Sequence, residues 1–457
     1  MATLKQFRGK RASLWQSAVD EVVAKEHAGS SPAAGFGQGT PHVKRPDQGD
    51  ASILGGNDIA EALDRDQDVP KVPPPGPAAG IGDTVKFCST TALKLAEARV
   101  KAFFTKDDTE LKRLEEELGA PFGNCDPKWA TVVAVYVASR LAEKPIPYRL
   151  YNDITDFVIT DRLPDHGTVA LVADWGTGQD GARKLLAKIA AKKPDTVIHL
   201  GDVYYSGTES EVQNYFYAIW QKVLGIPKVA WGAKLTDLAA KPATYHLTGN
   251  HDMYAGGQPY YTVIDMLGQP ASYFCLRNEK WQFIALDTGL HDANPVAQGQ
   301  PTFLEDTEVA WLKHKIGTAG SRKTILLSHH QLYTAYESEK IGGHLANEKL
   351  LAQVQDVLAD VTAWFWGHEH NLVIFKEHLN VLGRCIGHGA FPVAVDDAPV
   401  PSPDVPIENV PLGKDSRGGL FQHGYVLLTL DGSAAKVTYF QYDPDTDKEV
   451  VQHTEDL

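Results

Sequence analysis

Sulfur-containing residues are scarce, with four cysteines and three methionines among 457 residues. The cysteines are scattered and form no C-x-x-C pair, so we expect buried free thiols and neither a disulfide framework nor a zinc knuckle. They are Cys88, Cys125, Cys275 and Cys385.

Long apolar runs are also missing: no stretch is long and apolar enough to span a bilayer. The basic N-terminus has no apolar run behind it, which argues against a secretory signal peptide. We therefore expect a cytoplasmic protein without membrane association, although export without a signal peptide would leave no mark in the sequence.

Basic residues are fewer than acidic ones: the chain has 44 Lys and Arg and 58 Asp and Glu, and its formal net charge is -14. An acidic chain lacks the broad basic footprint of a general nucleic-acid binder, although a local basic cleft stays compatible with it. Hydrophobic residues make up 43% of the chain, which is enough for a sizeable core.

Composition predicts three regions. Residues 1–82 are rich in Gly and Pro and are expected to form a flexible segment, apart from a short helix at 12–26. Residues 83–145 have a helical pattern that includes an apolar helix at 129–141. Residues 146–457 alternate strand-like and helical runs, which implies sheets covered by helices.

The third region has clear local signals. The expected strands are 168–173, 196–200, 243–247, 281–286, 324–327 and 361–365, and the expected helices include 182–191 and 305–316. Near the end, Asp431-Gly432 joins two runs as a hairpin, 425–430 and 436–441. The Pro-rich stretch 398–411 is typical of a long surface loop.

Five short motifs carry the chemistry. They are D-W-G at 174–176, G-D-V-Y-Y at 201–205, G-N-H-D at 249–252, L-L-S-H at 326–329 and G-H-E-H at 367–370. Each follows a strand-like run, and ligand sites in α/β sheets gather beyond the carboxyl ends of strands. Carboxylate, amide, phenol and imidazole groups are all competent metal ligands, and a carboxylate such as Asp202 can bridge two ions. Two ions about 3.5–4 Å apart clamp the attacking and leaving oxygens in phosphoryl transfer.

This set of motifs resembles the calcineurin-like metallophosphoesterase superfamily and, within it, the purple acid phosphatase type. The resemblance covers roughly 168–392, and the only departure from the pattern is Leu326 in place of valine. It implies a four-layer α/β/β/α sandwich within 146–457, to which residues 83–145 add a helical accessory region. It also implies hydrolysis of phosphate esters by attack of a metal-bridging hydroxide. Metal one would be held by Asp174, Tyr205 and His370, metal two by Asn250, His329 and His368, with Asp202 between them.

The charges of these ligands favour particular metals. Metal one would have two anionic ligands of its own, whereas metal two would have only neutral ones. A phenolate is a hard oxygen donor that suits Fe(III), beside a divalent Fe, Zn or Mn ion. Other branches have a histidine at the position of Gly176, and Tyr205 could replace that imidazole. By motif register, Tyr204 is a neighbour and not a ligand.

Further residues are candidates near the centre. The resemblance implies that His251 stabilises phosphoryl oxygens or protonates the leaving group. Asp252 beside it could orient its ring, with a turn-capping role as the alternative. His344 is a candidate for substrate contact, and His330 and His388 are weaker ones. We expect Asp287-Thr288 to support the site without ligating a metal, and His246 to be a core residue.

Three other functions compete with a phosphatase of small phosphate esters. Protein serine/threonine phosphatases of the superfamily carry an arginine in the second motif, where this chain has Ser206. A cyclic-nucleotide or other phosphodiesterase with a divalent metal pair is the main alternative. A binding protein on an inactive phosphoesterase fold would have lost ligands, and all seven are present.

Overall fold

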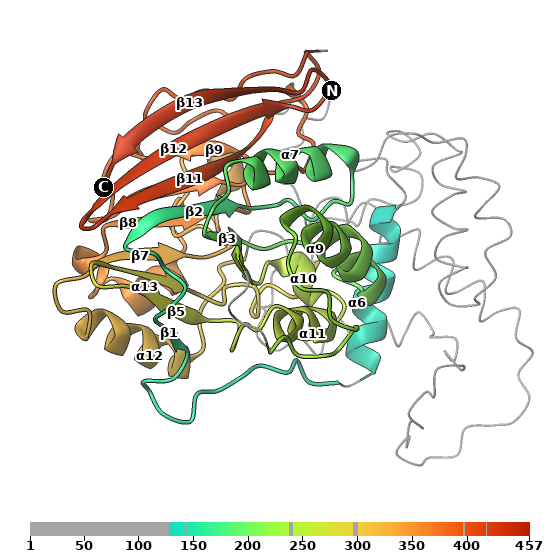
Figure 1. Ribbon diagram of the computed structural model, residues 1–457. Helices are drawn as coiled ribbons and strands as arrows, with labels where there is room; N and C mark the ends of the chain where they lie inside the picture. The colour runs from blue at the N-terminus through green and yellow to red at the C-terminus, as the bar shows by residue number, and fades with distance from the viewer. Residues whose placement is uncertain (1–127, 143, 237–240, 296–299, 396–397, 417) are drawn as a thin grey trace, which may run out of the picture. The chain divides into compact units, whose positions relative to one another are not determined.

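The structure is a computed structural model that describes residues 128–142, 144–236, 241–295, 300–395, 398–416 and 418–457 (Figure 1). The chain divides into two compact units. The larger one is built mainly from Ile146–Ala293 and Gly299–Leu457 and contains both sheets. The other includes helix α6 (Lys128–Leu141), close to the helix predicted at 129–141.

Two mixed sheets form the larger unit. The seven-stranded sheet runs β1 (Val158–Ile159), β5 (Phe274–Arg277), β6 (Trp281–Ala285), β7 (Lys323–Leu327), β8 (Ala363–Trp366), β10 (Leu382–Ile386) and β9 (Leu372–Ile374). The six-stranded sheet runs β13 (Lys448–Asp456), β12 (Ala434–Asp443), β11 (His423–Asp431), β2 (His166–Val172), β3 (Thr196–His199) and β4 (Ala243–His246). The pairs β2–β3 and β3–β4 of one sheet and β6–β7 and β7–β8 of the other are parallel, so within each sheet the carboxyl ends of these strands lie at the same edge.

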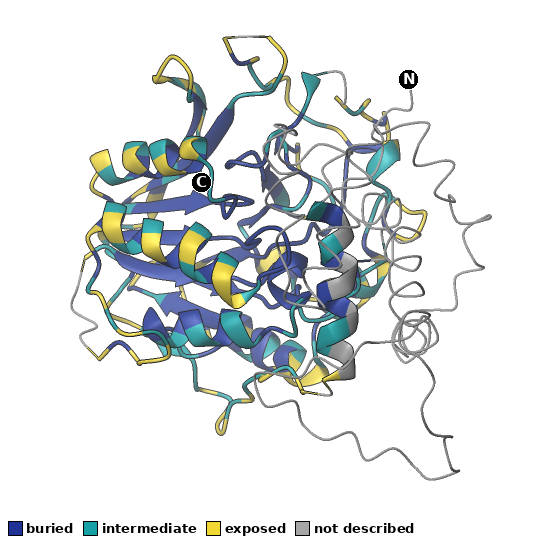
Figure 2. Ribbon diagram, turned by 90° about the vertical axis from the view of Figure 1, so that its right-hand side faces the viewer, coloured by how far each residue is buried: buried dark blue, intermediate teal, exposed yellow. Residues whose placement is uncertain are grey.

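The core lies in three apolar layers. Side chains from both sheets, such as Leu171, Ile198 and Phe283, pack together between the sheets. The outer face of the six-stranded sheet is covered by α7 (Asp180–Ala191), the π-helical turn η1 (Val212–Tyr217), α9 (Ala218–Leu224) and α11 (Gln258–Met266). The outer face of the seven-stranded sheet is covered by α12 (Asp306–Gly317) and α13 (Glu348–Val354). Figure 2 shows these helices buried on the inner side and exposed on the outer side. The four-layer α/β/β/α sandwich is therefore confirmed.

The short elements are turns between these layers. They are α8 (Glu209–Glu211), α10 (Asn250–Met253), η2 (Glu337–Glu339) and η3 (Leu358–Asp360).

The predicted elements of the larger unit are present within a few residues of their expected bounds. The hairpin of β11 and β12 turns at Gly432, which has a φ of 59°. Cys275 and Cys385 are buried free thiols, as expected. The helix at 12–26, the flexible segment 1–82, and Cys88 and Cys125 lie outside the described residues. The division at 82 and 145 stays a prediction.

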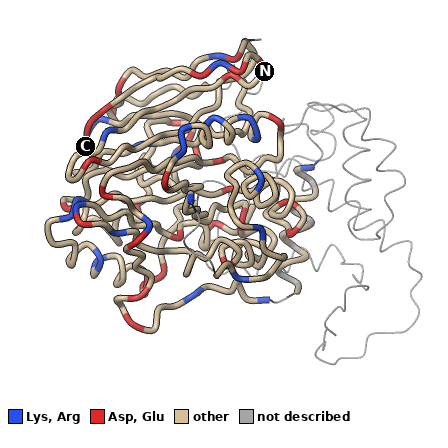
Figure 3. The backbone as a smooth tube through the Cα atoms, in the orientation of Figure 1, with Lys and Arg blue, Asp and Glu red and all other residues tan. Residues whose placement is uncertain are grey.

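Acidic and basic residues are interspersed along the described chain (Figure 3). Helix α7 illustrates this, since Lys188 and Lys192 reach Asp447 and Glu449 on the neighbouring sheet. Among the described residues, no helix combines the length and the apolar character needed to cross a bilayer.

Candidate metal centre

The predicted ligands stand at the carboxyl ends of five strands. Asp174 follows β2, Asp202 follows β3 and Asn250 follows β4, while His329 follows β7 and the G-H-E-H turn follows β8. Four of these residues have a positive φ, a conformation that non-glycine residues rarely adopt and that clusters at functional sites. The values are 53° for Asp174, 80° for Asp202, 68° for His368 and 50° for His370. Each turn therefore bends sharply out of its strand, which directs the side chain across the edge of the sheet.

Glycines allow these turns to meet. A Cβ atom on Gly201, whose φ is 99°, would lie 2.7 Å from the amide nitrogen of Gly249 and 2.8 Å from Nδ1 of His329. A Cβ atom on Gly249 would overlap the carboxylate of Asp202. The second and third motifs can therefore approach each other only with glycine at both positions.

Asp174 and His370, two of the ligands predicted for metal one, lie side by side. Oδ1 of Asp174 lies 3.1 Å from Nε2 of His370, and both side chains are buried. The hydroxyl of Tyr204 lies 2.8 Å from each of these two atoms. The structure thus places a tyrosine oxygen in this group. That oxygen belongs to Tyr204, whereas the spacing of the motif predicts Tyr205 as the ligand.

Tyr205, the predicted ligand, is also buried. Its amide donates to Glu211 and its carbonyl oxygen accepts from Nδ1 of His251 at 2.5 Å. From the sequence, only the motif spacing distinguishes Tyr204 from Tyr205 as the ligand. Which phenol reaches the metal-one group depends on how the turn at 202–205 bends.

The group predicted to hold metal two consists of three neutral side chains, His329, His368 and Asn250. Nε2 of His329 lies 3.3 Å from Nδ1 of His368. His329 donates its ring proton from Nδ1 to the carbonyl oxygen of Leu200, which leaves Nε2 as the nitrogen for a metal. Asn250 donates from Nδ2 to the hydroxyl of Tyr254, so its side-chain oxygen points away from Tyr254 and is the atom left to bind a metal.

Asp202 lies between the two groups. Its Oδ1 is 3.4 Å from Nε2 of His329, and ligand atoms of Asp174, Asp202 and His329 all lie within 4.8 Å of one another. The backbone amide of His368 donates to Oδ2 of Asp174 at 2.8 Å, which ties the two groups together. A carboxylate, a phenol and an imidazole on one side, with two imidazoles and an amide on the other, fit a pair of hard or borderline metal ions.

His251 and Asp252 have separate tasks. The ring of His251 packs at a tilt against those of Tyr204 and Tyr254, with centroids 4.5 and 4.8 Å away. Its Nδ1 faces the carbonyl oxygen of Tyr205, whereas the sequence suggested Asp252 as the group that orients it. Asp252 instead accepts from the amides of Asp202 and Gly249 and from Nε2 of His246, so it holds the two ligand turns together.

Two further histidines differ in position. His344 is more than half exposed and lies 3.1 Å from Glu348, so substrate contact by His344 stays a prediction. His330 is buried, and its ring lies 4.3 Å from that of His368. Thr288 and Asp292 engage its two ring nitrogens at 3.0 and 2.9 Å, an arrangement that fits a support for His368.

Burial also sets the charge around the centre. Burial raises the pKa of Glu369, between the two histidines of the last motif, to about 7.

Asp287 accepts a hydrogen bond from Thr248 at 2.5 Å, and Thr248 precedes Gly249. Asp287-Thr288 therefore supports two of the ligand turns, in line with the expectation from the sequence.

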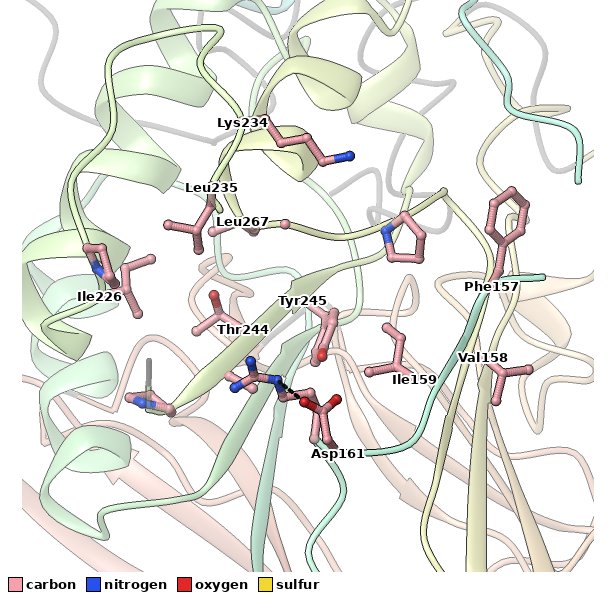
Figure 4. A pocket seen from close by; sticks show the side chains of 16 residues that line it. Phe157, Val158, Ile159, Asp161, Ile226, Lys234, Leu235, Thr244, Tyr245 and Leu267 are labelled. Atoms are coloured by element: carbon pink, nitrogen blue, oxygen red, sulfur yellow. Dashed lines mark ion pairs between the residues drawn. The ribbon is translucent and has the colours of Figure 1, made fainter. Parts of the chain in front are cut away.

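A cavity of about 330 Å³ lies on the larger unit, away from the predicted ligands (Figure 4). It opens between β1 and β4, the edge strands of the two sheets, and its lining includes Phe157, Tyr245 and Leu267 beside Arg162 and Lys234. None of the seven predicted ligands lines it.

Two helix-covered sheets with carboxylate and imidazole groups at one edge define a metallophosphoesterase-type fold. Residues 167–372 match the model of the calcineurin-like phosphoesterase family. This match includes all five motifs. No curated protein matches it by sequence.

The structure is similar to several solved structures. A dimetal phosphatase from Danio rerio is 13% identical, covers 63% of this chain and 98% of its own, and has a TM-score of 0.39. Vps29 from Entamoeba histolytica, a D62A mutant, is 12% identical, covers 64% and 99%, and has a TM-score of 0.29. Phosphopantetheinyl hydrolase from Mycobacterium tuberculosis is 12% identical, covers 49% and 90%, and has a TM-score of 0.29. At these values the likenesses say nothing about chemistry.

Proposed function

We propose that this chain is a binuclear-metal phosphoesterase of the purple acid phosphatase type that hydrolyses small phosphate monoesters. The observation that carries the proposal is the tyrosine hydroxyl 2.8 Å from both Asp174 and His370. A phenol oxygen beside a carboxylate favours a trivalent ion such as Fe(III), and the neutral metal-two group favours a divalent Fe, Zn or Mn ion.

When bound, the two ions would supply an activated water and neutralise the charge of the phosphoryl group. The residues of the chain itself would carry out the proton transfer to the leaving group. His251 carries its ring proton on Nδ1, towards the carbonyl oxygen of Tyr205, so Nε2 is the nitrogen that can exchange a proton with a leaving group. Packing against Tyr204 and Tyr254 restricts the orientation of this ring.

A phosphodiesterase with a divalent metal pair is the second candidate. The contact between Tyr204 and Asp174 that supports iron also fits a neutral hydroxyl that donates to the carboxylate. In that case the phenol would position Asp174 without binding a metal.

The test combines metal analysis with turnover of p-nitrophenyl phosphate and bis(p-nitrophenyl) phosphate. We expect about two metal ions per chain, one of them iron, and faster hydrolysis of the monoester. Asn250→Ala and His329→Ala should each remove the second ion and abolish turnover. His166→Ala is the matched control, because this histidine is exposed and pairs with Asp431.

Full metal occupancy and normal turnover in either ligand variant would overturn the metal centre. Two divalent ions with a preference for the diester would favour the second candidate.

A further inference from the structure

We propose that Tyr204, and not Tyr205, supplies the phenol oxygen to metal one. This inference rests on the proposed function and departs from the spacing of the G-D-x-x-Y motif, in which the fifth residue is the ligand. It assigns to Tyr204 a place among the metal ligands that the sequence pattern gives to its neighbour.

The distances among three donor atoms are the first argument. The Tyr204 hydroxyl, Oδ1 of Asp174 and Nε2 of His370 form a triangle with edges of 2.8, 2.8 and 3.1 Å. Donors that bind one ion at about 2.0–2.2 Å and at right angles are about 3 Å apart. The three atoms are thus already spaced as adjacent ligands of one ion, with no rearrangement of the side chains.

The packing of the ring is the second argument. Tyr204 is fully buried, and its ring lies between those of His251 and Phe391 at 4.5 and 4.9 Å. Phe391 also stacks on the ring of His370 at 4.0 Å. One phenylalanine therefore orients both the phenol and the imidazole of the metal-one group, as the groups that pack around a metal site commonly do.

Gly176 gives the third argument. The amide of Tyr204 donates to the carbonyl oxygen of Gly176, and Gly176 pairs with Val203 as an isolated β-bridge. A Cβ atom at 176 would lie 2.6 Å from the carbonyl oxygen of Asp202 and 2.9 Å from Cα of Val203. The absence of a side chain at 176 thus allows the segment that carries Tyr204 to lie against the segment that carries Asp174.

Tyr205 takes part in a different way. Glu211 accepts from the amides of Tyr205, Ser206 and Thr208 and anchors this turn. The carbonyl oxygen of Tyr205 then orients His251. A backbone role of this kind does not depend on the phenol, so a phenylalanine at 205 can fulfil it.

On metal binding, the Tyr204 O–H bond would break, its proton would pass to solvent, and an oxygen–metal bond would form. Metal one then keeps two anionic ligands of its own, Asp174 and Tyr204. The charge asymmetry between the two metal groups is the same as in the proposal with Tyr205.

The experiment compares Tyr204→Phe with Tyr205→Phe in the full chain, purified without chelator, by visible absorption and iron content. We expect the wild type to show a broad visible band from phenolate-to-iron charge transfer. Tyr205→Phe should retain that band, and Tyr204→Phe should lose at least about nine-tenths of it together with most of the iron.

Loss of the band in Tyr205→Phe, with retention in Tyr204→Phe, would overturn the inference and leave the proposed function intact. A colourless wild type that binds two divalent ions would overturn both this inference and the iron centre, while the phosphoesterase assignment stands. A wild type without metal or turnover would remove the proposed function itself. Should Tyr204→Phe fail to fold by circular dichroism, the band of Tyr205→Phe decides: retained, it supports Tyr204, and lost, it overturns it.

Discussion

Nδ1 of His199 lies 2.9 Å from Nδ1 of His246, and both rings are completely buried below the ligand turns. The amide of Trp175 donates to Nε2 of His199, so the proton of that ring is on Nδ1 and points to His246. His246 must then carry its proton on Nε2, which faces Oδ1 of Asp252 at 3.2 Å. Burial lowers the pKa of His199 well below its ordinary range, which agrees with a neutral ring at this position. A single chain of hydrogen bonds thus runs from the first motif to the carboxylate that holds the second and third.

Interrupting this chain should loosen the metal centre. His246→Phe keeps a ring in place but removes the bonds to His199 and Asp252, so we expect stability to fall by about 1–3 kcal/mol. Loss of such support typically lowers metal affinity about 10–100-fold. Competition with a coloured chelator measures the affinity, and denaturant unfolding of the metal-free protein measures the stability.

The control for this variant is Phe216→Leu. Phe216 stacks on His246 with centroids 4.4 Å apart, so the change removes packing and leaves the hydrogen bonds. We expect it to cost about 1 kcal/mol of stability and to leave metal affinity within about twofold. Equal metal affinity in His246→Phe and the wild type would show that the chain of hydrogen bonds does not act on the centre.

Tyr254 should matter for metal two through Asn250. Its hydroxyl accepts from Nδ2 of Asn250 and so fixes which end of the amide faces the metal. Tyr254→Phe should lower the affinity for the second ion about tenfold and leave the first ion in place. Metal content after dialysis at graded free metal measures both. A variant that loses the two ions equally would contradict a role specific to metal two.

The fold was predictable because the larger unit follows simple patterns. Apolar runs such as 196–200 and 324–327 become β3 and β7, and Asp431-Gly432 forms the hairpin of β11 and β12. Strand β13 was not predicted, because its residues alternate between intermediate and exposed at the edge of the sheet and carry no apolar run.

The site was predictable to the level of its motifs. Sequence spacing places Asp174, His370 and His329 at strand ends, and the structure brings them together. It could not show which tyrosine of the pair reaches Asp174, since that depends on the bend of a turn with positive φ at Asp202. It also could not pair His199 with His246, which are adjacent only through the register of β3 and β4.

Glu308 should destabilise the fold as pH rises. Burial raises the pKa of this carboxyl well above its ordinary range, and the nearby Asp287 raises it further. The folded state therefore retains a proton that the unfolded chain loses above about pH 4.3, and stability falls from there with increasing pH. Its two oxygens accept from the amide of Asp287 and the hydroxyl of Tyr148, contacts that an amide can largely reproduce.

We expect Glu308→Gln to have a higher Tm than the wild type, by a margin that widens between pH 5 and pH 8. Glu279→Gln is the control, because this glutamate is exposed. Thermal unfolding at several pH values measures the margin. A margin that is constant or that narrows with pH would contradict a protonated Glu308.

Two buried histidines should make the fold sensitive to acid. Burial lowers the pKa of His388 and of His423 to about 4. The folded state keeps these rings neutral while the unfolded chain takes up protons below about pH 6.5, so stability is lost as pH falls from 6.5 towards 4. Because of this pKa difference between the folded and unfolded states, each ring lowers the free energy of unfolding by about 2 kcal/mol at pH 5.

His423→Gln should therefore lose less stability than the wild type between pH 7.5 and pH 5, with a gain of about 4 °C in relative Tm at pH 5. His166→Gln, at an exposed position, is the control and should follow the wild type. Parallel Tm curves for His423→Gln and the wild type would show that His423 does not oppose folding in acid.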